Sequence, residues 1–179
     1  MSLNMIDVQR AQAFSVAAHC AVGQKRKYTG IDYYHHPFEV AQLIRDHALV
    51  FNMDMIVAAL LHDVVEDTQV TGGQVREVFG PVVAKLVAEV TDVSTPADGS
   101  RESRKSLDRL HLAKASAEGQ TIKLADLICN CRDIVQHDSK FASIYMREKR
   151  LLLGVLNRGD ARLYEMAFGL VQSYFAEAG

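Results

Sequence analysis

The sequence has 179 residues, of which 49% are apolar and 23% are charged, so it can bury a core and lacks the composition of a disordered chain. The net charge of -2 gives no overall basic surface for nucleic acid, and no run of about 20 apolar residues predicts a membrane span. The N-terminus lacks a signal-peptide pattern and the cysteines number only three, which favours a reduced, cytoplasmic chain. We expect no nucleic-acid and no membrane partner, and the sequence leaves the possibility of a homo-oligomer open.

The predicted elements are all helices, because apolar residues recur close to a 3.6-residue period. In chain order the predicted helices cover residues 6–22, 37–49, 54–67, 72–79, 81–93, 101–117, 120–136, 140–157 and 160–177. Valine-rich runs such as VVAKLVAEV could form strands, but their length and spacing favour helix. The prediction is an all-α, single domain over residues 1–179, with roughly eight or nine helices.

Several residues are suited to begin or end these helices. Pro37 fits the first turn of the second helix, after a basic and aromatic loop. Asp54 and Thr71 can each cap a helix, and Gly80 followed by Pro81 separates the short helix from the next one. The segment 94–100, STPADGS, is the clearest loop.

The segment LLHDVVEDT (60–68) places one imidazole and three carboxylates within an apolar run. Because residues four apart share a helix face, His62 is expected to lie over Glu66 and Asp63 over Asp67. Unpaired charge is costly to bury, so the sequence requires something that compensates these carboxylates.

A divalent metal ion would supply that compensation, and other helices offer further ligands. His36 precedes Pro37, and Asp126 lies in the apolar segment IKLADLICN, four residues before Asn130. Imidazole and carboxylate together suit Mn, Zn or Fe. A structural network of a core histidine and carboxylates is the alternative.

The order His, His-Asp, Asp is the signature of the HD phosphohydrolase superfamily, which this chain resembles. The segments AAHCAVGQKRKYTG, HDVVEDT, FGPVVAKLVAEVTD and KLADLICN resemble more narrowly the hydrolase domain of the RelA/SpoT family. The chain is most similar to the stand-alone small alarmone hydrolases of that family, which include the metazoan SpoT homologue. The resemblance runs from about residue 17 to residue 130 and weakens to a helical pattern beyond.

The resemblance implies metal-dependent removal of the 3′-pyrophosphate of ppGpp or pppGpp by a metal-activated water, giving GDP or GTP and pyrophosphate. It implies one divalent ion, Mn²⁺ first, with Zn²⁺, Fe²⁺ or Mg²⁺ as alternatives. A second reading keeps the site but changes the substrate to the 2′-phosphate of NADPH or to a nucleoside monophosphate. A third reading is a non-catalytic nucleotide-binding module.

The resemblance also implies roles for individual residues. The metal ligands would be His36, His62, Asp63 and Asp126. The catalytic residues that orient or activate water would be Glu66 and Asp67. The substrate-binding residues would be Arg26, Lys27, Lys123 and Asn130.

Some of these roles have ordinary alternatives. The basic run at 25–27 could be a solvated surface, and Asn130 could be a polar residue on a helix face. His35 could contact a ligand from behind, or could itself be the ligand after a local shift, although the following Pro37 favours His36.

Overall fold

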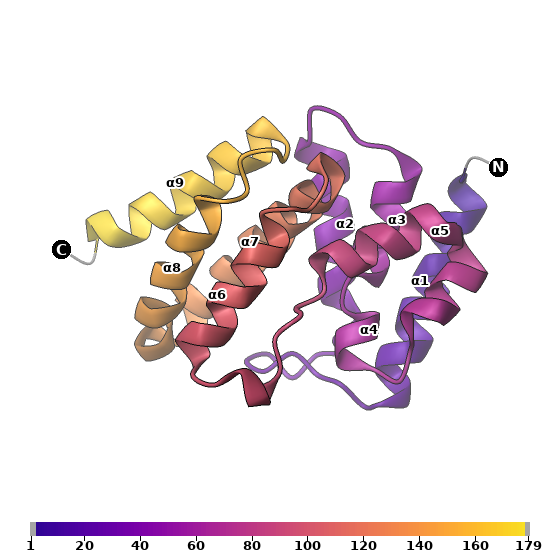
Figure 1. Cartoon of the computed structure of the whole chain (residues 1–179), viewed down its shortest axis with the longest axis horizontal. Coiled ribbons are helices and arrows are strands. Elements are labelled where there is room, and N and C mark those ends of the chain that lie inside the picture. Colours follow the sequence, from indigo (N-terminus) through magenta and orange to yellow (C-terminus); the bar gives the residue numbers. More distant parts are fainter. Residues whose placement is uncertain (1–2, 178–179) are drawn as a thin grey trace.

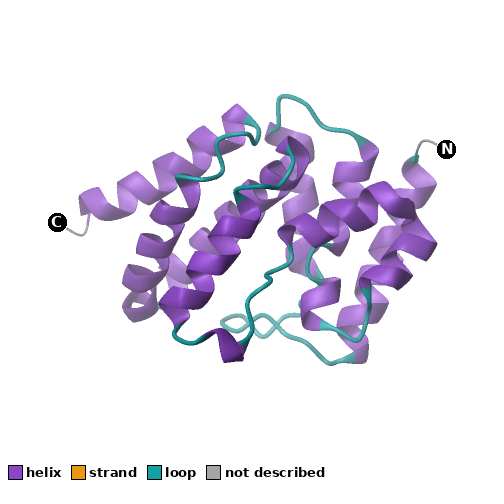
Figure 2. Cartoon of the chain, in the orientation of Figure 1, coloured by secondary structure: helices purple, strands orange, loops and turns teal. Residues whose placement is uncertain are grey.

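A computed structural model describes residues 3–177, and residues 1–2 and 178–179 of the predicted domain lie outside the described part. Within residues 3–177 the chain is helical with no strand, which confirms the all-α prediction (Figure 2). The helices are α1 (Met5–Ala21), α2 (His35–His47), α3 (Met53–Leu61), α4 (Val64–Asp67), α5 (Gly72–Val90), the 3₁₀-helix η1 (Pro96–Asp98), α6 (Arg101–Leu112), α7 (Ala117–His137), α8 (Ser139–Leu153) and α9 (Ala161–Glu177).

Helix α7 runs through the middle of the bundle and packs against α2, α3, α5, α8 and α9 (Figure 1). Helices α8 and α9 cover one side of α7, while α1, α3 and α5 lie on the other. Helix α3 is apolar all round, and every residue from Met55 to Leu61 is buried between α1, α2 and α5. The interior position of α3 carries the residues that follow it, His62 and Asp63, into the protein.

The predicted continuous helix over 54–67 is wrong, because α3 ends at Leu61 and α4 begins at Val64. At the break, His62 Nδ1 lies 2.8 Å from the carbonyl oxygen of Ala59, which in a continuous helix would accept the Asp63 N–H. The imidazole of His62 therefore contacts a carbonyl that would otherwise accept a backbone hydrogen bond of the helix. Asp54 does not cap α3, since the side chain of Asn52 accepts the Met55 N–H instead.

Helix α5 joins two predicted helices across a kink. Thr71 caps it in a capping box with Gln74, as expected. Gly80 has φ 88°, a conformation that favours glycine, and the following Pro81 begins the second straight segment. The chain thus stops one helix and starts the next at the predicted place, without an intervening loop.

No helix between residues 3 and 177 combines the length and apolarity that a membrane span needs.

Candidate metal centre and active site

Three elements bring the four predicted metal ligands together inside the bundle. His36 lies in the first turn of α2, the pair His62-Asp63 at the junction of α3 and α4, and Asp126 in α7. His36, His62 and Asp126 are 1%, 2% and 6% exposed. Because α7 packs on both α2 and α3, residues far apart in the sequence meet there.

The ligand atoms of these residues converge closely. His36 Nε2 lies 3.1 Å from Asp126 Oδ1, and His62 Nε2 lies 3.0 Å from Asp63 Oδ2. The crossed distances are similar, at 3.7 Å for His36 to Asp63 and 3.8 Å for His62 to Asp126. One ligand atom from each of His36, His62 and Asp126 falls within 4.8 Å of the others. These spacings are suited to a single ion between the side chains.

The state of His62 tests whether these residues fit a cation. Its Nδ1 contacts the Ala59 carbonyl, which can only accept, so Nδ1 carries a proton and Nε2 is the nitrogen that faces the carboxylates. Burial alone would lower the pKa of His62, but the Asp63 and Asp126 carboxylates raise that pKa well above its ordinary value, so this point of the interior attracts positive charge. Among the described residues this buried Nε2 has no hydrogen-bond partner, and the Asp63 oxygen 3.0 Å away lacks hydrogen-bond geometry. Two imidazoles and two carboxylates that face one another in the interior favour a positive charge between them, whether a proton or a metal ion. The donor set therefore fits a divalent metal ion, which imidazole and carboxylate ligate.

Other side chains hold the two carboxylates in place. The Tyr33 hydroxyl donates to Asp63 Oδ2 at 2.8 Å, and Asn130 Nδ2 donates to Asp126 Oδ1 at 2.5 Å. Lys123 Nζ lies 3.0 Å from Asp126 Oδ2. Burial alone would raise the pKa of the Asp126 carboxyl, but Lys123 and the two histidines hold that pKa well below its usual range. Such contacts fix ligand orientation and charge around a metal site.

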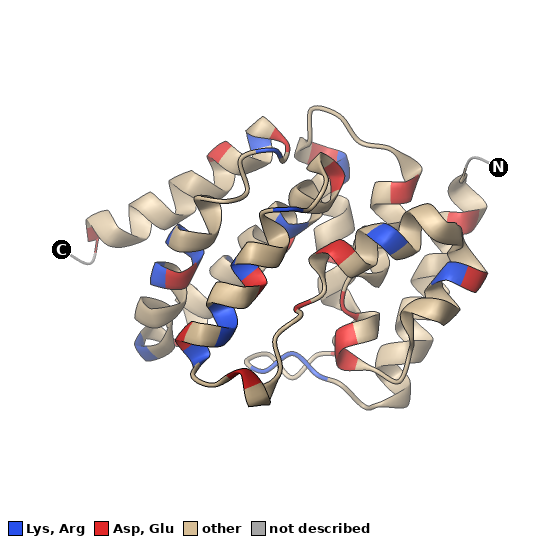
Figure 3. Ribbon diagram, viewed as in Figure 1, with Lys and Arg blue, Asp and Glu red and all other residues tan. Residues whose placement is uncertain are grey.

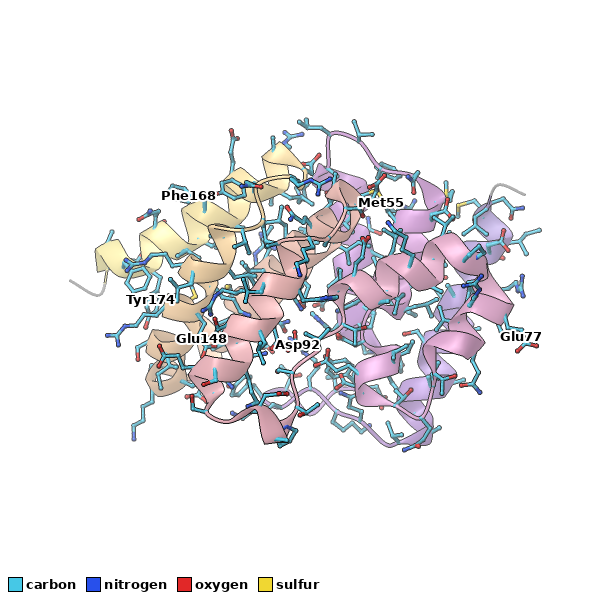
Figure 4. The ribbon with its side chains drawn as sticks, viewed as in Figure 1. Met55, Glu77, Asp92, Glu148, Phe168 and Tyr174 are labelled. Carbon is cyan, nitrogen blue, oxygen red and sulfur yellow. The ribbon has the colours of Figure 1, made fainter. Side chains whose placement is uncertain are left out.

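The acidic pair on α4 is held by contacts from outside that helix. Glu66 Oε2 accepts the backbone N–H of Asp92 at 3.2 Å, and Asp67 Oδ2 accepts the Gln24 amide at 2.9 Å. Asp92 follows α5 and lies near the centre of the view in Figure 4. Glu66 is exposed as a residue, yet partial burial of its carboxyl and the nearby Asp92 carboxylate raise its pKa to about 7. Burial and the Asp63 carboxylate likewise raise the pKa of Asp67.

The loop before α2 contains the basic run 25–27, and Figure 3 colours its lysines and arginine blue. The side chains of Arg26 and Lys27 in this run have different surroundings. The Arg26 side chain is only 11% exposed, and its guanidinium donates to Asp133 at 2.7 Å and to Asn130 Oδ1 at 3.2 Å. Arg26 thereby supports Asn130, which in turn contacts Asp126. The Lys27 side chain is 71% exposed and lies 3.4 Å from Asp138, so the structure does not bring it to the cluster of ligands.

A small cavity of 50 Å³ is lined by three lysines, Lys105, Lys123 and Lys149, and by Asp92. Lys105 pairs with Asp92, and Lys123 pairs with Asp126. Burial, followed by the charge of Lys123, lowers the pKa of the half-buried Lys149 to about 8. Sequence reasoning missed Asp92 and Lys105. The spacing of Lys105 and Asp108, three residues apart on one helix, was a signal for the lysine, and Asp92 ends the segment FGPVVAKLVAEVTD that carries part of the resemblance.

His35 lies apart from the ligand cluster. It is exposed, its ring packs on Tyr34 with centroids 4.5 Å apart, and it lines a groove of 680 Å³ between the basic loop, α2 and α7. The groove also reaches Arg26 and Asp133, but its lining includes none of the four predicted ligands. His36, and not His35, is therefore the histidine that faces the other ligand residues.

An all-helical bundle that presents histidine, histidine-aspartate and aspartate from three helices at one point defines the HD class of proteins. A family model described as an HD domain matches residues 11–150, and the chain belongs to this HD-domain family.

Several animal proteins of one name are similar in sequence to this chain. The chain is 37% identical to mouse and human guanosine-3′,5′-bis(diphosphate) 3′-pyrophosphohydrolase MESH1 over 127 residues, which cover 70% of this chain and 69% of each relative. The zebrafish protein of that name is 37% identical over 105 residues, and the match covers 59% of this chain and 57% of that protein. The chain thus spans somewhat more than half of the zebrafish relative.

A solved structure is similar over almost its whole length. It is described as a metazoan ortholog of SpoT that hydrolyzes ppGpp and plays a role in starvation responses. The two share 27% sequence identity with a TM-score of 0.85, and the match covers 97% of this chain and 98% of the other. This similarity includes α8 and α9, where the sequence resemblance is weak.

Proposed function

We propose that this protein hydrolyses the 3′-pyrophosphate of ppGpp and pppGpp, and releases GDP or GTP together with pyrophosphate. In this reaction the oxygen of a water molecule bonds to the phosphorus next to the ribose 3′-oxygen. The bond between that phosphorus and the 3′-oxygen breaks, and the 3′-oxygen leaves with a proton. The relatives that are named for this activity support the assignment of substrate.

One observation carries the proposal: the cluster of His36, His62, Asp63 and Asp126 lies next to an acidic residue with a pKa of about 7, Glu66. The four residues would hold the ion, and we propose that it is Mn²⁺, for which carboxylate ligands are suited. When bound, such an ion supplies Lewis-acid activation of water and of phosphoryl oxygens.

The remaining residues of the site act on protons and charges. Glu66 has a pKa near neutrality, which suits a residue that accepts the proton of the attacking water. Asp67 lies one residue further along α4 and orients that water. Lys123 and Lys149 offset the charge of the pyrophosphate, and Lys27 reaches it only if its exposed side chain turns inward. Arg26 positions Asn130 by donating to its side-chain oxygen, and the Asn130 amide in turn donates to Asp126.

We further propose that the functional domain covers residues 1–179, although the family model matches only 11–150. The packing of α9 against α7 and α8 supports this extent, because α7 carries Asp126. The cytoplasmic location and the lack of a nucleic-acid partner stay predictions from the sequence.

The proposal is tested by incubating the Mn²⁺-loaded protein with ppGpp, pppGpp, NADPH and nucleoside monophosphates in parallel, and by identifying the products. We expect pyrophosphate from the first two substrates and no phosphate from the others. If phosphate were released from NADPH and from no other compound, the proposed substrate would be wrong, and the proposed active site would still stand. No turnover of any of them by protein with confirmed metal content would rule out both enzymatic readings.

A further inference from the structure

A buried histidine on α1 connects to the acidic pair through one glutamine side chain. Gln24 follows α1, and its Nε2 donates to Asp67 Oδ2 at 2.9 Å. Its Oε1 lies 2.7 Å from His19 Nδ1, and His19 is completely buried. The backbone of Gln24 is also held, because its N–H donates to the His19 carbonyl and its carbonyl accepts the Tyr33 N–H. The glutamine amide therefore bridges the protein interior and the carboxylate on α4.

The tautomer of His19 decides which way this amide points. Gln24 Oε1 can only accept a hydrogen bond, so His19 Nδ1 must carry the proton for both contacts to exist. If the proton were on Nε2, Nδ1 would be an acceptor and the amide would have to turn over. The side-chain oxygen of Gln24 would then face the Asp67 carboxylate, and these oxygens would repel each other.

The surroundings of His19 favour the Nδ1–H tautomer. Among the described residues, His19 Nε2 is buried without a hydrogen-bond partner. With the proton on Nδ1, the ring N–H donates to Gln24 Oε1, whereas a proton on Nε2 would be a buried N–H without an acceptor, which is rare in proteins. Burial lowers the pKa of His19, so the ring is neutral near pH 7. The ring also packs on Tyr33, with centroids 5.0 Å apart, and the Tyr33 hydroxyl donates to Asp63.

We propose that His19 and Gln24 form a positioning relay in which the Nδ1–H of His19 orients the Gln24 amide and the amide in turn fixes the Asp67 carboxylate. Neither residue touches substrate. The effect on turnover rests on the proposed function of Asp67, whereas the arrangement of protons in the relay does not. His19 thereby supports both edges of the site, Asp67 through Gln24 and Asp63 through Tyr33.

The first test reads the relay without any substrate. Nitrogen-15 NMR of the full chain reports which ring nitrogen of His19 carries the proton at neutral pH. We expect a proton on Nδ1, together with slowed exchange of the Gln24 side-chain amide protons. A ring with its proton on Nε2 alone would overturn the proposal. This measurement separates the relay from the proposed activity, because it holds even if the protein turns over no ppGpp.

The second test asks whether Gln24 acts through Asp67. Gln24→Met keeps the length of the side chain but removes both polar contacts, and we expect kcat to fall about 10-fold with KM changed less than about 2-fold. In a double-mutant cycle, Gln24→Met should add nothing in the background of Asp67→Ala, because that variant leaves no acceptor for the Gln24 amide. An equal loss in both backgrounds would show that Gln24 acts elsewhere, and the proposal would fail.

Two further variants control these results. Gln42 also donates from its amide to an aspartate, Asp46, but on the exposed face of α2, so Gln42→Met should leave kcat unchanged. His19→Asn retains a donor close to the position of Nδ1, so its kcat should stay close to that of the wild type. His19→Phe has no such donor, so its kcat should fall as far as that of Gln24→Met. If His19→Asn and His19→Phe lost the same activity while both kept the melting temperature of the wild type, the tautomer would have no part in positioning.

Discussion

The hydroxyl of Tyr33 donates a hydrogen bond of 2.8 Å to Asp63 Oδ2, one of the four atoms that converge on the candidate metal centre. Tyr33 lies in the loop before α2 and Asp63 between α3 and α4, so this contact ties the basic loop to the metal site. Because the bond holds one carboxyl oxygen, it leaves the orientation of Asp63 fixed before an ion arrives.

We predict that Tyr33→Phe weakens Mn²⁺ binding about 10-fold, since contacts behind metal ligands contribute that much to affinity. Competition with a fluorescent chelator measures this loss. Tyr28→Phe is the matched control, because Tyr28 also donates to an aspartate, Asp138, outside the ligand cluster. Equal affinities of the two variants would contradict a role of Tyr33 in holding Asp63.

The segment 62–67 has two proposed roles, metal binding and proton transfer, and substitutions that remove one role or the other should have different effects. Asp63→Ala should abolish both metal binding and turnover, because it removes a ligand. Glu66→Gln should bind metal normally but turn over at least about 100-fold more slowly, as expected when a proton acceptor is lost. Metal content and kcat are measured on the same preparations. Glu77→Gln, on the exposed surface of α5, is the control for charge removal (Figure 4). Full activity of Glu66→Gln would show that Glu66 accepts no proton.

The paired guanidinium of Arg26 predicts that its shape matters beyond its charge. Arg26→Lys keeps the charge but cannot contact Asp133 and Asn130 together, so kcat/KM should fall about 10-fold. Steady-state kinetics with ppGpp measures the loss, and Arg132→Lys, on an exposed position of α7, should have no effect. Were Arg26→Lys as active as the wild type, Arg26 would act only as a positive charge.

The raised pKa of Glu66 predicts how stability depends on pH in the metal-free protein. The folded protein holds this proton up to about pH 7, whereas the unfolded chain releases it near the ordinary glutamate pKa of 4.5. Between these values the folded state binds more protons, so this group makes stability fall as pH rises through the window. Glu66→Gln removes that contribution.

Melting temperatures of Glu66→Gln and the wild type, compared from pH 4.5 to pH 8, test this prediction. The difference should move in favour of Glu66→Gln as pH increases, and it should level off above pH 7. A constant difference would mean that the pKa of Glu66 is the same in the folded and unfolded protein.

Local patterns were sufficient for the fold class. The helical period, the cap at Thr71 and the stop at Gly80 depend on neighbours along the chain, and the structure confirms them. The break between α3 and α4 was not predictable in the same way. At this break the ring of His62 contacts the Ala59 carbonyl, and neighbours along the chain do not determine this contact.

The sequence by itself determined that this chain is a helical bundle and which residues, from His36 to Asp126, could share one ion. Tertiary structure alone decided what surrounds them. Arg26 meets Asp133 across 107 residues, and Gln24 meets Asp67 across 43. Periodicity reports which face of a helix is buried, but it carries no information on which distant side chain lies opposite. Only the packing of α1, α2 and α7 around α3 settles those partners.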